Sequence, residues 1–533
     1  MPRPADPTAL EILWNRLIAI VDEASAALVR TSFSTIVRES NDFACVLLDA
    51  EGRSLAQSSL SIPSFIGTLP VTVRHFLRAF PAASLRPGDV LVTNDPWIGT
   101  GHLNDINVAV PVFHRGRLVA IAASTAHAPD IGGRIRSPDN HEVFEEGLRI
   151  PTIKLYEAGH PNPAVMAFIR HNVRVPDQVE GDLAAQVAAD EAAGRRLVDL
   201  LEEYGIGDLR PLAHAIQERS EQATRSAIRE LRPGVYPCVL PVDGLGEDLR
   251  ISLALTVQHS PERILCDYAG TSPQQPDALN VVPNYTYAYT AFGLKCVLAP
   301  EIPNNDGCFR LFTVTAPEGS LLNPRFPAAV GARASIGHYL PVAVFGALAE
   351  AVPDRVRAAP GSPLWCVNIA GAWDGGRPFA GMFFFNGGMG GARGQAGLPC
   401  VSFPSNISNT PIEVLEHLFP LEFARKELVV GSGGRGQWPG GDGQVLECRV
   451  VNATPVTVTF LASRIQWPAE GLFGGGAGSL GSVLLNGQPI NPRSRRRLRP
   501  GDRLTLTTPG GGGYGRSESA AAHPATAGKG DTS

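Results

Sequence analysis

Two histidines and an aspartate, residue types that bind metal ions, occur close together in the first quarter of the chain. His102 precedes Asp105 by three residues, and His127 follows within the same run, DPWIGTGHLNDINVAVPVFHRGRLVAIAASTAHAPDIGG (residues 95–133). Imidazole nitrogens and carboxylate oxygens are ligands that zinc and manganese accept in proteins. These residue types indicate a divalent-metal site, provided that the fold brings His127 back beside Asp105.

The segments around these positions have the pattern of a β-hairpin. Residues 106–113 (INVAVPVF) and 118–125 (LVAIAAST) are rich in β-branched residues, and the turn between them (HRGR) contains a glycine. A hairpin closed there sets Asp105 opposite residue 126, to within one position. Directly paired residues have Cβ atoms roughly 5 Å apart, within reach of one ion. The alternative is that the three residues are ordinary solvated side chains at strand ends.

Two further loops carry carboxylates suited to chemistry. Asp42 lies in the segment RESND, just before a predicted strand, where an ion pair between Arg38 and Asp42 is the simpler interpretation. Glu146 lies in the segment EEGLRIP at the end of an irregular polar stretch. Because loops often carry function, Glu146 is a candidate substrate contact, and a solvated carboxylate is the alternative.

The composition argues against several classes of protein. Of the 533 residues, 44% are hydrophobic, and the net charge of −5 argues against nucleic acid or an anionic membrane as a partner. No apolar run reaches the roughly 18 residues that span a bilayer, and the first residues lack the layout of a signal peptide. The eight cysteines are scattered without a CxxC motif, as in a reducing compartment. We therefore expect a cytoplasmic protein.

Periodicity predicts a mixed α+β fold. The N-terminal domain, 1–232, is expected to hold the metal-binding hairpin and a helical block over about 163–231. Beyond it, short apolar runs separated by Gly and Pro indicate a β-rich α+β domain over 233–516. The last residues, 517–533, are dominated by small and polar types, so we expect a disordered tail.

Three segments are dense in glycine: 431–443 (GSGGRGQWPGGDG), 471–478 (GLFGGGAG) and 509–515 (PGGGGYG). A P-loop requires GxxxxGK[S/T], and a dinucleotide site requires GxGxxG between a strand and a helix with an acidic residue downstream; neither unit is present. The serine-hydrolase motif GxSxG is also absent. We interpret these glycines as positions where backbones approach closely or turn tightly.

Nine segments spread along the chain form a recognisable set. They are RESNDFACVLLDAEG (38–52), NDPWIGTGHLNDINVAVPVF (94–113), HAPDIGG (127–133), EEGLRIP (145–151), HNVRVPDQVEGDLAAQ (171–186), IPNNDGCFR (302–310), NTPIEVLE (409–416), GSGGRGQWPGGDG (431–443) and TPGGGGYG (508–515). This set resembles the B subunit of the hydantoinase/oxoprolinase family, which also includes subunits of ATP-dependent acetone and acetophenone carboxylases.

The resemblance implies a metal-bearing B subunit that works with a hydantoinase A-type subunit in a heterotetramer or larger assembly. The A subunit would use ATP to phosphorylate the carbonyl oxygen of a small cyclic amide, such as a hydantoin, 5-oxoproline or a lactam. The family's metal ligands map onto Asp42, His102, Asp105 and His127, and zinc or manganese is the expected metal. The metal would lower the pKa of a water molecule and supply hydroxide to the activated carbon.

Asp130 is the candidate catalytic residue under this mechanism. It lies three residues after His127, where it would orient a ligand imidazole or accept the proton of the water. It is equally well placed to be a turn residue before Gly132 and Gly133.

Two alternatives to a cyclic-amide hydrolase remain open. One is a subunit of an ATP-dependent ketone carboxylase, and the other is a non-catalytic assembly subunit, against which the intact His-Asp-His set argues. Two segments depart from the family pattern: 389–401 lacks an expected Asp-Gly, and 330–340 contains His338-Tyr339 where a polar or arginine-containing stretch is usual. If these loops line the substrate pocket, the substrate is not a standard one.

Overall fold

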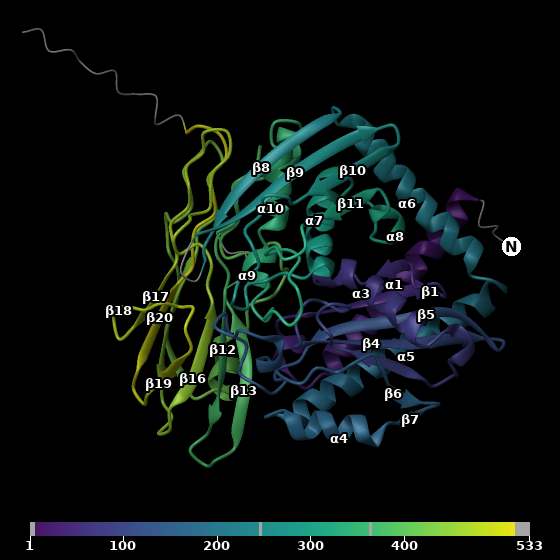
Figure 1. Cartoon of the computed structure of the whole chain (residues 1–533), viewed down its shortest axis with the longest axis horizontal. Helices are drawn as coiled ribbons and strands as arrows, with labels where there is room; N and C mark the ends of the chain where they lie inside the picture. The colour runs from purple at the N-terminus through teal and green to yellow at the C-terminus, as the bar shows by residue number, and fades with distance from the viewer. Residues whose placement is uncertain (1–5, 245–247, 362–364, 518–533) are drawn as a thin grey trace, which may run out of the picture.

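The computed structural model of the protein describes residues 6–244, 248–361 and 365–517. Within these ranges helices are mixed with strands that form four sheets, which confirms the predicted α+β class. Figure 1 shows the N-terminal sheet and its helices in purple and blue, a second sheet in teal, and two further sheets in green and yellow on the opposite side.

The N-terminal sheet has seven antiparallel strands in the order β2-β1-β5-β4-β3-β6-β7. They are β1 (Phe43–Asp49), β2 (Ser54–Gln57), β3 (Val90–Thr93), β4 (Asp105–His114), β5 (Arg117–His127), β6 (Ile153–Glu157) and β7 (His160–Pro161). Helices α1 (Pro7–Thr31) and α5 (Pro176–Glu203) cover one face, and α3 (Pro63–Ala79) covers the other. Side chains alternate along a strand, so Leu47 of β1 packs in the cluster of α1 and α5, while Val46 packs in the cluster of α3.

Three helices fill the helical block predicted over 163–231, namely α4 (Pro163–Asn172), α5 and α6 (Arg210–Glu230). Helix α5 packs against α1 and across β4 and β5, so it supports the central strands of the sheet. The other α-helices of the described part are α2 (Thr35–Arg38), α7 (Pro283–Leu298), α8 (Asp306–Phe309), α9 (Ala334–Gly337), α10 (Leu340–Leu348) and α11 (Ile412–Leu418). Every helix in the described ranges is too short or too polar to cross a membrane.

The second sheet has the strand order β11-β10-β9-β8, with β10 and β11 parallel and the other pairs antiparallel. Its strands are β8 (Gly234–Val242), β9 (Leu249–His259), β10 (Glu262–Asp267) and β11 (Phe312–Thr315). Helix α10 packs against β8 and β9, and α7 packs against β11. Because α7 also packs against α3, this layer is joined directly to the N-terminal sheet.

Two sheets pack face to face in the C-terminal part and share one hydrophobic cluster. The first has the order β13-β12-β16-β19 and the second β14-β15-β20-β17-β18. Their strands are β12 (Cys366–Ala372), β13 (Pro378–Phe384), β14 (Leu421–Leu428), β15 (Gln444–Val450), β16 (Val456–Leu461), β17 (Ser482–Leu485), β18 (Gln488–Pro489), β19 (Arg496–Leu498) and β20 (Arg503–Thr507). Strand β13 ends beside the candidate metal site, because Phe384 lines the same cavity as His102.

The glycine-rich segments come together in one place, which we call the glycine bundle (residues 387–391, 431–443, 471–478 and 509–515). Main-chain hydrogen bonds join them, such as Gly434 N to Gly511 O (2.7 Å) and Gly513 N to Gly476 O (2.9 Å). A Cβ atom at Gly510 would lie 1.8 Å from the carbonyl oxygen of Ser432. At such positions the backbones approach more closely than a side chain allows, which agrees with the interpretation from the sequence.

The division of the chain at residue 232 remains a prediction. One hydrophobic cluster contains Val46 and Ile228 from the first predicted domain together with Val242 and Tyr285 from the second. Of the expected disordered tail, residues 518–533 lie outside the described part of the chain.

Candidate metal centre

The hairpin of β4 and β5 brings Asp105 and His127 together. The two strands pair antiparallel, with Asp105 directly opposite His127 and Ile106 opposite Ala126. The sequence predicted residue 126, to within one position, as the partner of Asp105, so the observed partner His127 lies within the predicted range. Since β4 begins at Asp105 and β5 ends at His127, both side chains lie at the open end of the hairpin, where the loop that carries His102 arrives.

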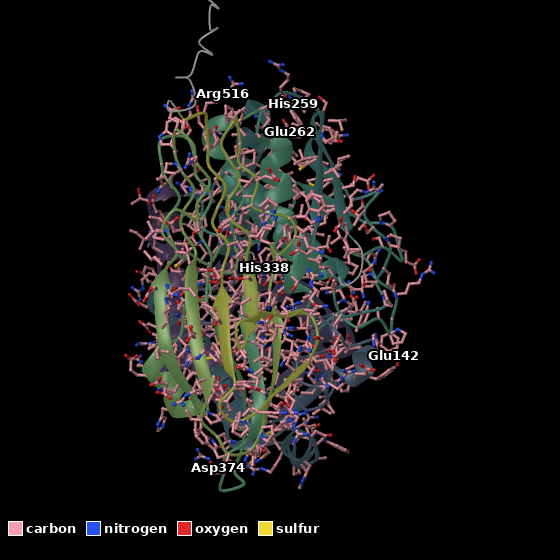
Figure 2. The ribbon with its side chains drawn as sticks, turned by 90° about the vertical axis from the view of Figure 1, so that its left-hand side faces the viewer. Glu142, His259, Glu262, His338, Asp374 and Arg516 are labelled. Atoms are coloured by element: carbon pink, nitrogen blue, oxygen red, sulfur yellow. The ribbon has the colours of Figure 1, made fainter. Side chains whose placement is uncertain are left out.

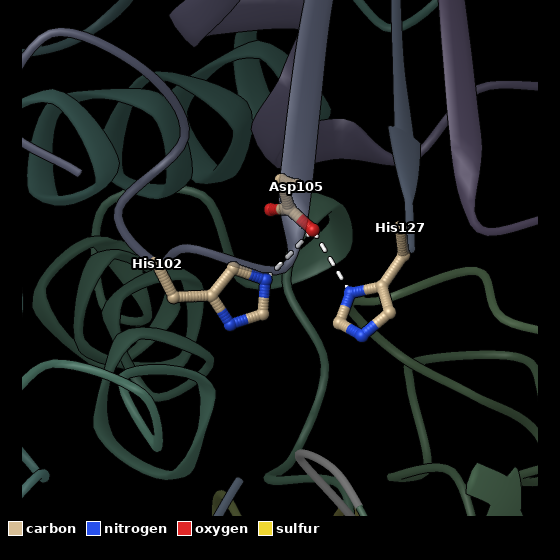
Figure 3. A group of neighbouring side chains, drawn as sticks. All are labelled: His102, Asp105 and His127. Carbon is tan, nitrogen blue, oxygen red and sulfur yellow. Dashed lines mark hydrogen bonds and ion pairs between the residues drawn. The ribbon is translucent and has the colours of Figure 1, made fainter. Parts of the chain in front are cut away.

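The carboxylate of Asp105 lies between the two imidazole rings (Figure 3). Its Oδ1 atom is 2.7 Å from Nε2 of His102 and 2.9 Å from Nδ1 of His127. One ligand atom from each residue can be chosen so that all three lie within 4.8 Å of one another. All three side chains are buried, with at most 2% of their surface exposed, so the interpretation as solvated strand ends is wrong.

The buried nitrogen atoms of this group fit a divalent cation. Nε2 of His127 has no hydrogen-bond partner, and Nε2 of His102 lies 2.7 Å from Oδ1 of Asp105. Buried polar atoms without a partner are uncommon in folded proteins, and an ion is one of the things that satisfies them. Two imidazoles and a carboxylate are also the donor set expected for zinc or manganese.

Asp42, the residue that precedes β1, lies beside this group. Its Oδ2 atom is 3.7 Å from Nδ1 of His127, and its side chain is buried. The ion pair with Arg38 that seemed simpler from the sequence is not formed, because Arg38 pairs with Glu39 (3.8 Å). The structure therefore brings Asp42 to the edge of the group, and its role as a fourth ligand remains a prediction.

Burial and neighbouring charges set the protonation of the group. Burial, with a further contribution from Arg333, holds the pKa of His102 well below its ordinary value, so the ring is in the neutral form that binds metal. Burial also acts to raise the pKa of Asp105, but His102 and Arg333 outweigh it, and that pKa lies well below its usual range. For Asp42, burial raises the pKa to about 6 despite the nearby His127.

Arg333 is a buried part of this site that sequence reasoning did not find. Its Nη2 atom donates to Oδ2 of Asp105 at 2.6 Å, and its Nε atom donates to the carbonyl oxygen of Thr100 at 2.7 Å. The hydroxyl of Thr100 donates to the same Oδ2 atom at 2.7 Å, and the guanidinium lies 4.0 Å from the ring centroid of Tyr285. The only signal in the sequence was the position of Arg333 within the atypical segment 330–340.

A small cavity of about 20 Å³ adjoins the three residues, enough for one or two water-sized groups. Its lining residues are Asp42, Ile62, Ser64, Phe65, His102, Asp105, His127, Arg136, Tyr285, Tyr289, Arg333, Ala334, His338, Phe384, Ser405 and Ile407. His338, labelled near the middle of the view in Figure 2, is buried, with its Nε2 atom 3.0 Å from the hydroxyl oxygen of Tyr285. The segment 330–340 thus lines the candidate site, whereas 389–401 begins within the glycine bundle and continues beside it, where Gly397 N bonds to Pro439 O.

Glu146 is buried rather than solvated, which corrects one of the two interpretations of this residue. Its Oε1 atom accepts hydrogen bonds from Val330 N (2.8 Å) and Gly331 N (2.6 Å), while Oε2 has no partner. Burial raises the pKa of Glu146 to about 8, although the two N–H groups oppose the shift. Glu146 lines a second cavity of about 20 Å³, which shares Arg136 with the first. Its role as a substrate contact remains a prediction.

Asp130 is held by Arg174 and not by a ligand imidazole. Its Oδ1 atom is 2.6 Å from Nη1 of Arg174, and its Oδ2 atom accepts from the backbone N–H of the same residue. Arg174 also donates to the carbonyl oxygen of Gly133. These contacts favour the structural alternative for Asp130, so its catalytic role is a prediction without geometric support.

Comparisons with known proteins identify the family of this chain. The family model for hydantoinase B/oxoprolinase matches residues 6–517. A protein assigned as the B subunit of a D-/L-hydantoinase, from Pseudomonas sp. (strain NS671), is 30% identical over 96% of this chain and 90% of its own length. The crystal structure of ATP-dependent caprolactamase from Pseudomonas jessenii superposes with a TM-score of 0.87 and 25% identity, over 97% of this chain and 93% of that one.

A structure of acetone carboxylase shares the fold. It covers 98% of this chain and 78% of its own, with a TM-score of 0.86 and 20% identity. The matches in sequence and in structure thus run along almost the full length of the chain, including the hairpin that carries the candidate metal centre. The chain therefore belongs to the hydantoinase B/oxoprolinase family.

Proposed function

We propose that this protein is the metal-bearing, hydrolytic B subunit of an ATP-dependent cyclic-amide hydrolase. Its substrate would be a hydantoin, 5-oxoproline or lactam-type ring whose carbonyl oxygen is phosphorylated by an A-type partner subunit. The observation that carries the proposal is the buried group of His102, Asp105 and His127, in which Nε2 of His127 has no hydrogen-bond partner. Support comes from relatives that are named for this chemistry and match over almost their full length.

The ligands of the proposed metal are His102, Asp105 and His127, with Asp42 completing the set. A divalent zinc or manganese ion held by these residues would supply Lewis acidity, which lowers the pKa of water toward neutrality. Amide resonance makes the ring carbonyl a poor electrophile. Phosphorylation in the partner subunit would make this carbonyl more electrophilic, and a strong nucleophile in the site of this chain would attack it.

The residues of this chain hold the site in place. Arg333 and Thr100 bind the second oxygen of Asp105, which fixes the carboxylate so that its first oxygen faces the two imidazoles. Phe65 and Phe384 line the cavity and limit the access of bulk water, which strengthens the interactions between charges. His338, absent from the usual family pattern, faces the same cavity and is the natural candidate for setting substrate choice.

A ketone carboxylase subunit is the second candidate function. The shared fold with acetone carboxylase favours it, but at 20% identity that likeness concerns the fold alone. The assembly-subunit alternative would leave the buried Nε2 atom of His127 without a partner. The eight cysteines are all free, which suits a reducing compartment such as the cytoplasm.

The first experiment is the metal content of the purified chain by mass spectrometry, beside His127→Ala and His114→Ala. His114 lies on the same hairpin and is also buried, but it pairs with Glu202 (2.6 Å), so it controls for the loss of a buried histidine. We expect stoichiometric zinc or manganese in the wild type and in His114→Ala, and none in His127→Ala. A wild type that stays metal-free after refilling overturns the proposal.

Reconstitution with an A-type subunit then separates the two enzymatic candidates. Hydrolysis of a cyclic amide with ATP consumption, independent of bicarbonate, supports the hydrolase. ATP consumption that requires both a ketone and bicarbonate supports the carboxylase instead.

A further inference from the structure

Arg136 is a buried arginine at the wall between the two cavities. It lies in the irregular segment after Gly133, its side chain is almost fully buried, and it lines both the metal-ligand cavity and the cavity of Glu146. Its Nε atom donates to the carbonyl oxygen of Gly331 at 2.9 Å, and its own carbonyl oxygen accepts from the hydroxyl of Thr459. Arg136 is therefore held from two sides in one orientation.

Among the described residues, Arg136 forms no ion pair within 4.0 Å. Asp42 and Glu146 line the same cavities, yet no carboxylate oxygen of the described ranges lies within 4.0 Å of its guanidinium. Arg333, which lines the same cavity, is 2.6 Å from Asp105. Besides its bond to Gly331, the guanidinium of Arg136 makes one weak contact, from Nη1 to Sδ of Met382 at 3.8 Å. An arginine has five N–H donors, so most of those of Arg136 remain available.

A buried guanidinium without a direct ion pair is costly, and an anionic ligand would offset part of that cost. The carboxylates of Asp42 and Asp105 are matched in number by the guanidinium groups of Arg136 and Arg333. A bound divalent ion would leave the cavity with an excess of positive charge. In charge, the cavity is therefore suited to an oxyanion, and its 20 Å³ accommodates one or two of the oxyanion's atoms.

We propose that Arg136 is the residue that recognises an oxyanion of the ligand in the metal cavity. The oxyanion is a phosphoryl group or a carboxylate, which a guanidinium binds with two parallel hydrogen bonds. The proposal rests on the proposed function in one respect: an activated amide carries a phosphoryl group, and a ring-opened product carries a carboxylate. Anion binding itself is measurable without turnover and without the partner subunit.

Arg464 provides a matched control for Arg136. It is also buried, and no carboxylate of the described residues lies within 4.0 Å of it. Its Nη1 atom donates to the carbonyl oxygen of Pro468, and its guanidinium lies 4.6 Å from the ring centroid of Tyr339. Arg464 is not among the residues that line the metal cavity, so its loss should disturb the fold as much as the loss of Arg136 without affecting a ligand there.

The experiment is calorimetric titration of the full chain with inorganic phosphate and, separately, with acetate, before and after loading with zinc. The variants are Arg136→Met, Arg136→Lys and Arg464→Met, each checked for an unchanged far-UV spectrum. A hydrogen-bonded charge pair typically changes affinity by about 10- to 100-fold, so we expect that loss for Arg136→Met. Arg136→Lys should lose less, since it keeps the charge but not the paired geometry, and Arg464→Met should bind as the wild type does.

Tighter binding of phosphate than of acetate assigns the site to a phosphoryl group, and the reverse order assigns it to a carboxylate. Equal affinity in wild type and Arg136→Met, an equal loss in Arg464→Met, or no binding of either probe by the wild type overturns the proposal. Failure of the metal function is a separate result: zinc uptake is then absent, while anion binding that depends on Arg136 persists.

Discussion

The metal-ligand group and the glycine bundle are two tightly packed regions that reach their packing by opposite means. Around Asp105, four buried side chains converge on one carboxylate, from His102, His127, Thr100 and Arg333. In the glycine bundle the segments meet through their main chains, whose N–H and C=O groups bond directly to one another. The packing of the metal-ligand group requires particular side-chain atoms. The packing of the glycine bundle requires that no side-chain atoms stand between the backbones. Substitutions should therefore harm the two regions in different ways.

The largest effect is expected for Gly510→Ala in the glycine bundle. The added Cβ would lie 1.8 Å from Ser432 O, a main-chain atom that cannot move aside alone. We expect a loss of stability of about 4 kcal/mol or more, measured by urea unfolding, with misfolding as the extreme. Gly207→Ala is the control, because a Cβ atom there would have no neighbour within 4 Å among the described residues. A Gly510→Ala variant as stable as this control would show that the bundle tolerates side chains.

Asp105→Asn should give the next largest effect, and it acts through lost charge with little change in shape. The neutral amide leaves the buried Arg333 without its counter-charge, which costs about 3 kcal/mol of stability in the metal-free chain. It also removes the central ligand, so metal content measured by mass spectrometry should fall to background. Retention of metal by this variant would contradict the ligand assignment.

Glu146→Gln should produce a smaller effect that depends on pH. In the folded chain the pKa of Glu146 is raised to about 8 from an ordinary value of 4.5, so the folded state binds this proton more tightly than the unfolded state does. The stability that Glu146 contributes is therefore complete below pH 4.5 and is lost as the pH rises to about 8.

Glutamine at position 146 can still accept from Val330 N and Gly331 N, but it has no proton to lose. The melting temperature of the variant relative to the wild type should accordingly increase between pH 5 and pH 8. A difference that is constant over this range would mean that the carboxyl group does not titrate there.

Asp130→Asn should have the smallest effect of the four. It weakens the pair with Arg174, which is about one-third exposed, and we expect a loss of about 1 kcal/mol with the metal content unchanged. Stability by thermal melting and metal content by mass spectrometry test both parts. A drop in metal content would restore Asp130 as a residue that supports the site.

The sequence predicted the half of the candidate site that is local. Asp105 and His127 lie at the two ends of one hairpin, and hairpin register follows from alternation and turn length, so their proximity was accessible from spacing. Arg333 was not accessible in this way, because 228 positions separate it from Asp105 and no periodic pattern connects them. Arg136 was missed because its place in the wall between the two cavities is set by tertiary packing, which no spacing in the sequence reveals.

The glycine segments show a different limit of prediction. Their composition indicated close approach of backbones, but not which segments meet, because glycine carries no alternation of apolar and polar side chains. The burial of Glu146 was also missed, since its hydrogen-bond donors belong to Val330 and Gly331 on a distant loop. Contacts of this kind are set by tertiary packing alone.

The long separation between Asp105 and Arg333 has a consequence for the order of assembly. During synthesis the hairpin leaves the ribosome more than 200 residues before the arginine that closes the site, since the two residues are 228 positions apart. Local contacts form faster than distant ones, so the His-Asp-His group can form while it is still open to solvent. In this order of events, an ion would be captured before Arg333 closes the site, and the bound ion would exchange slowly afterwards.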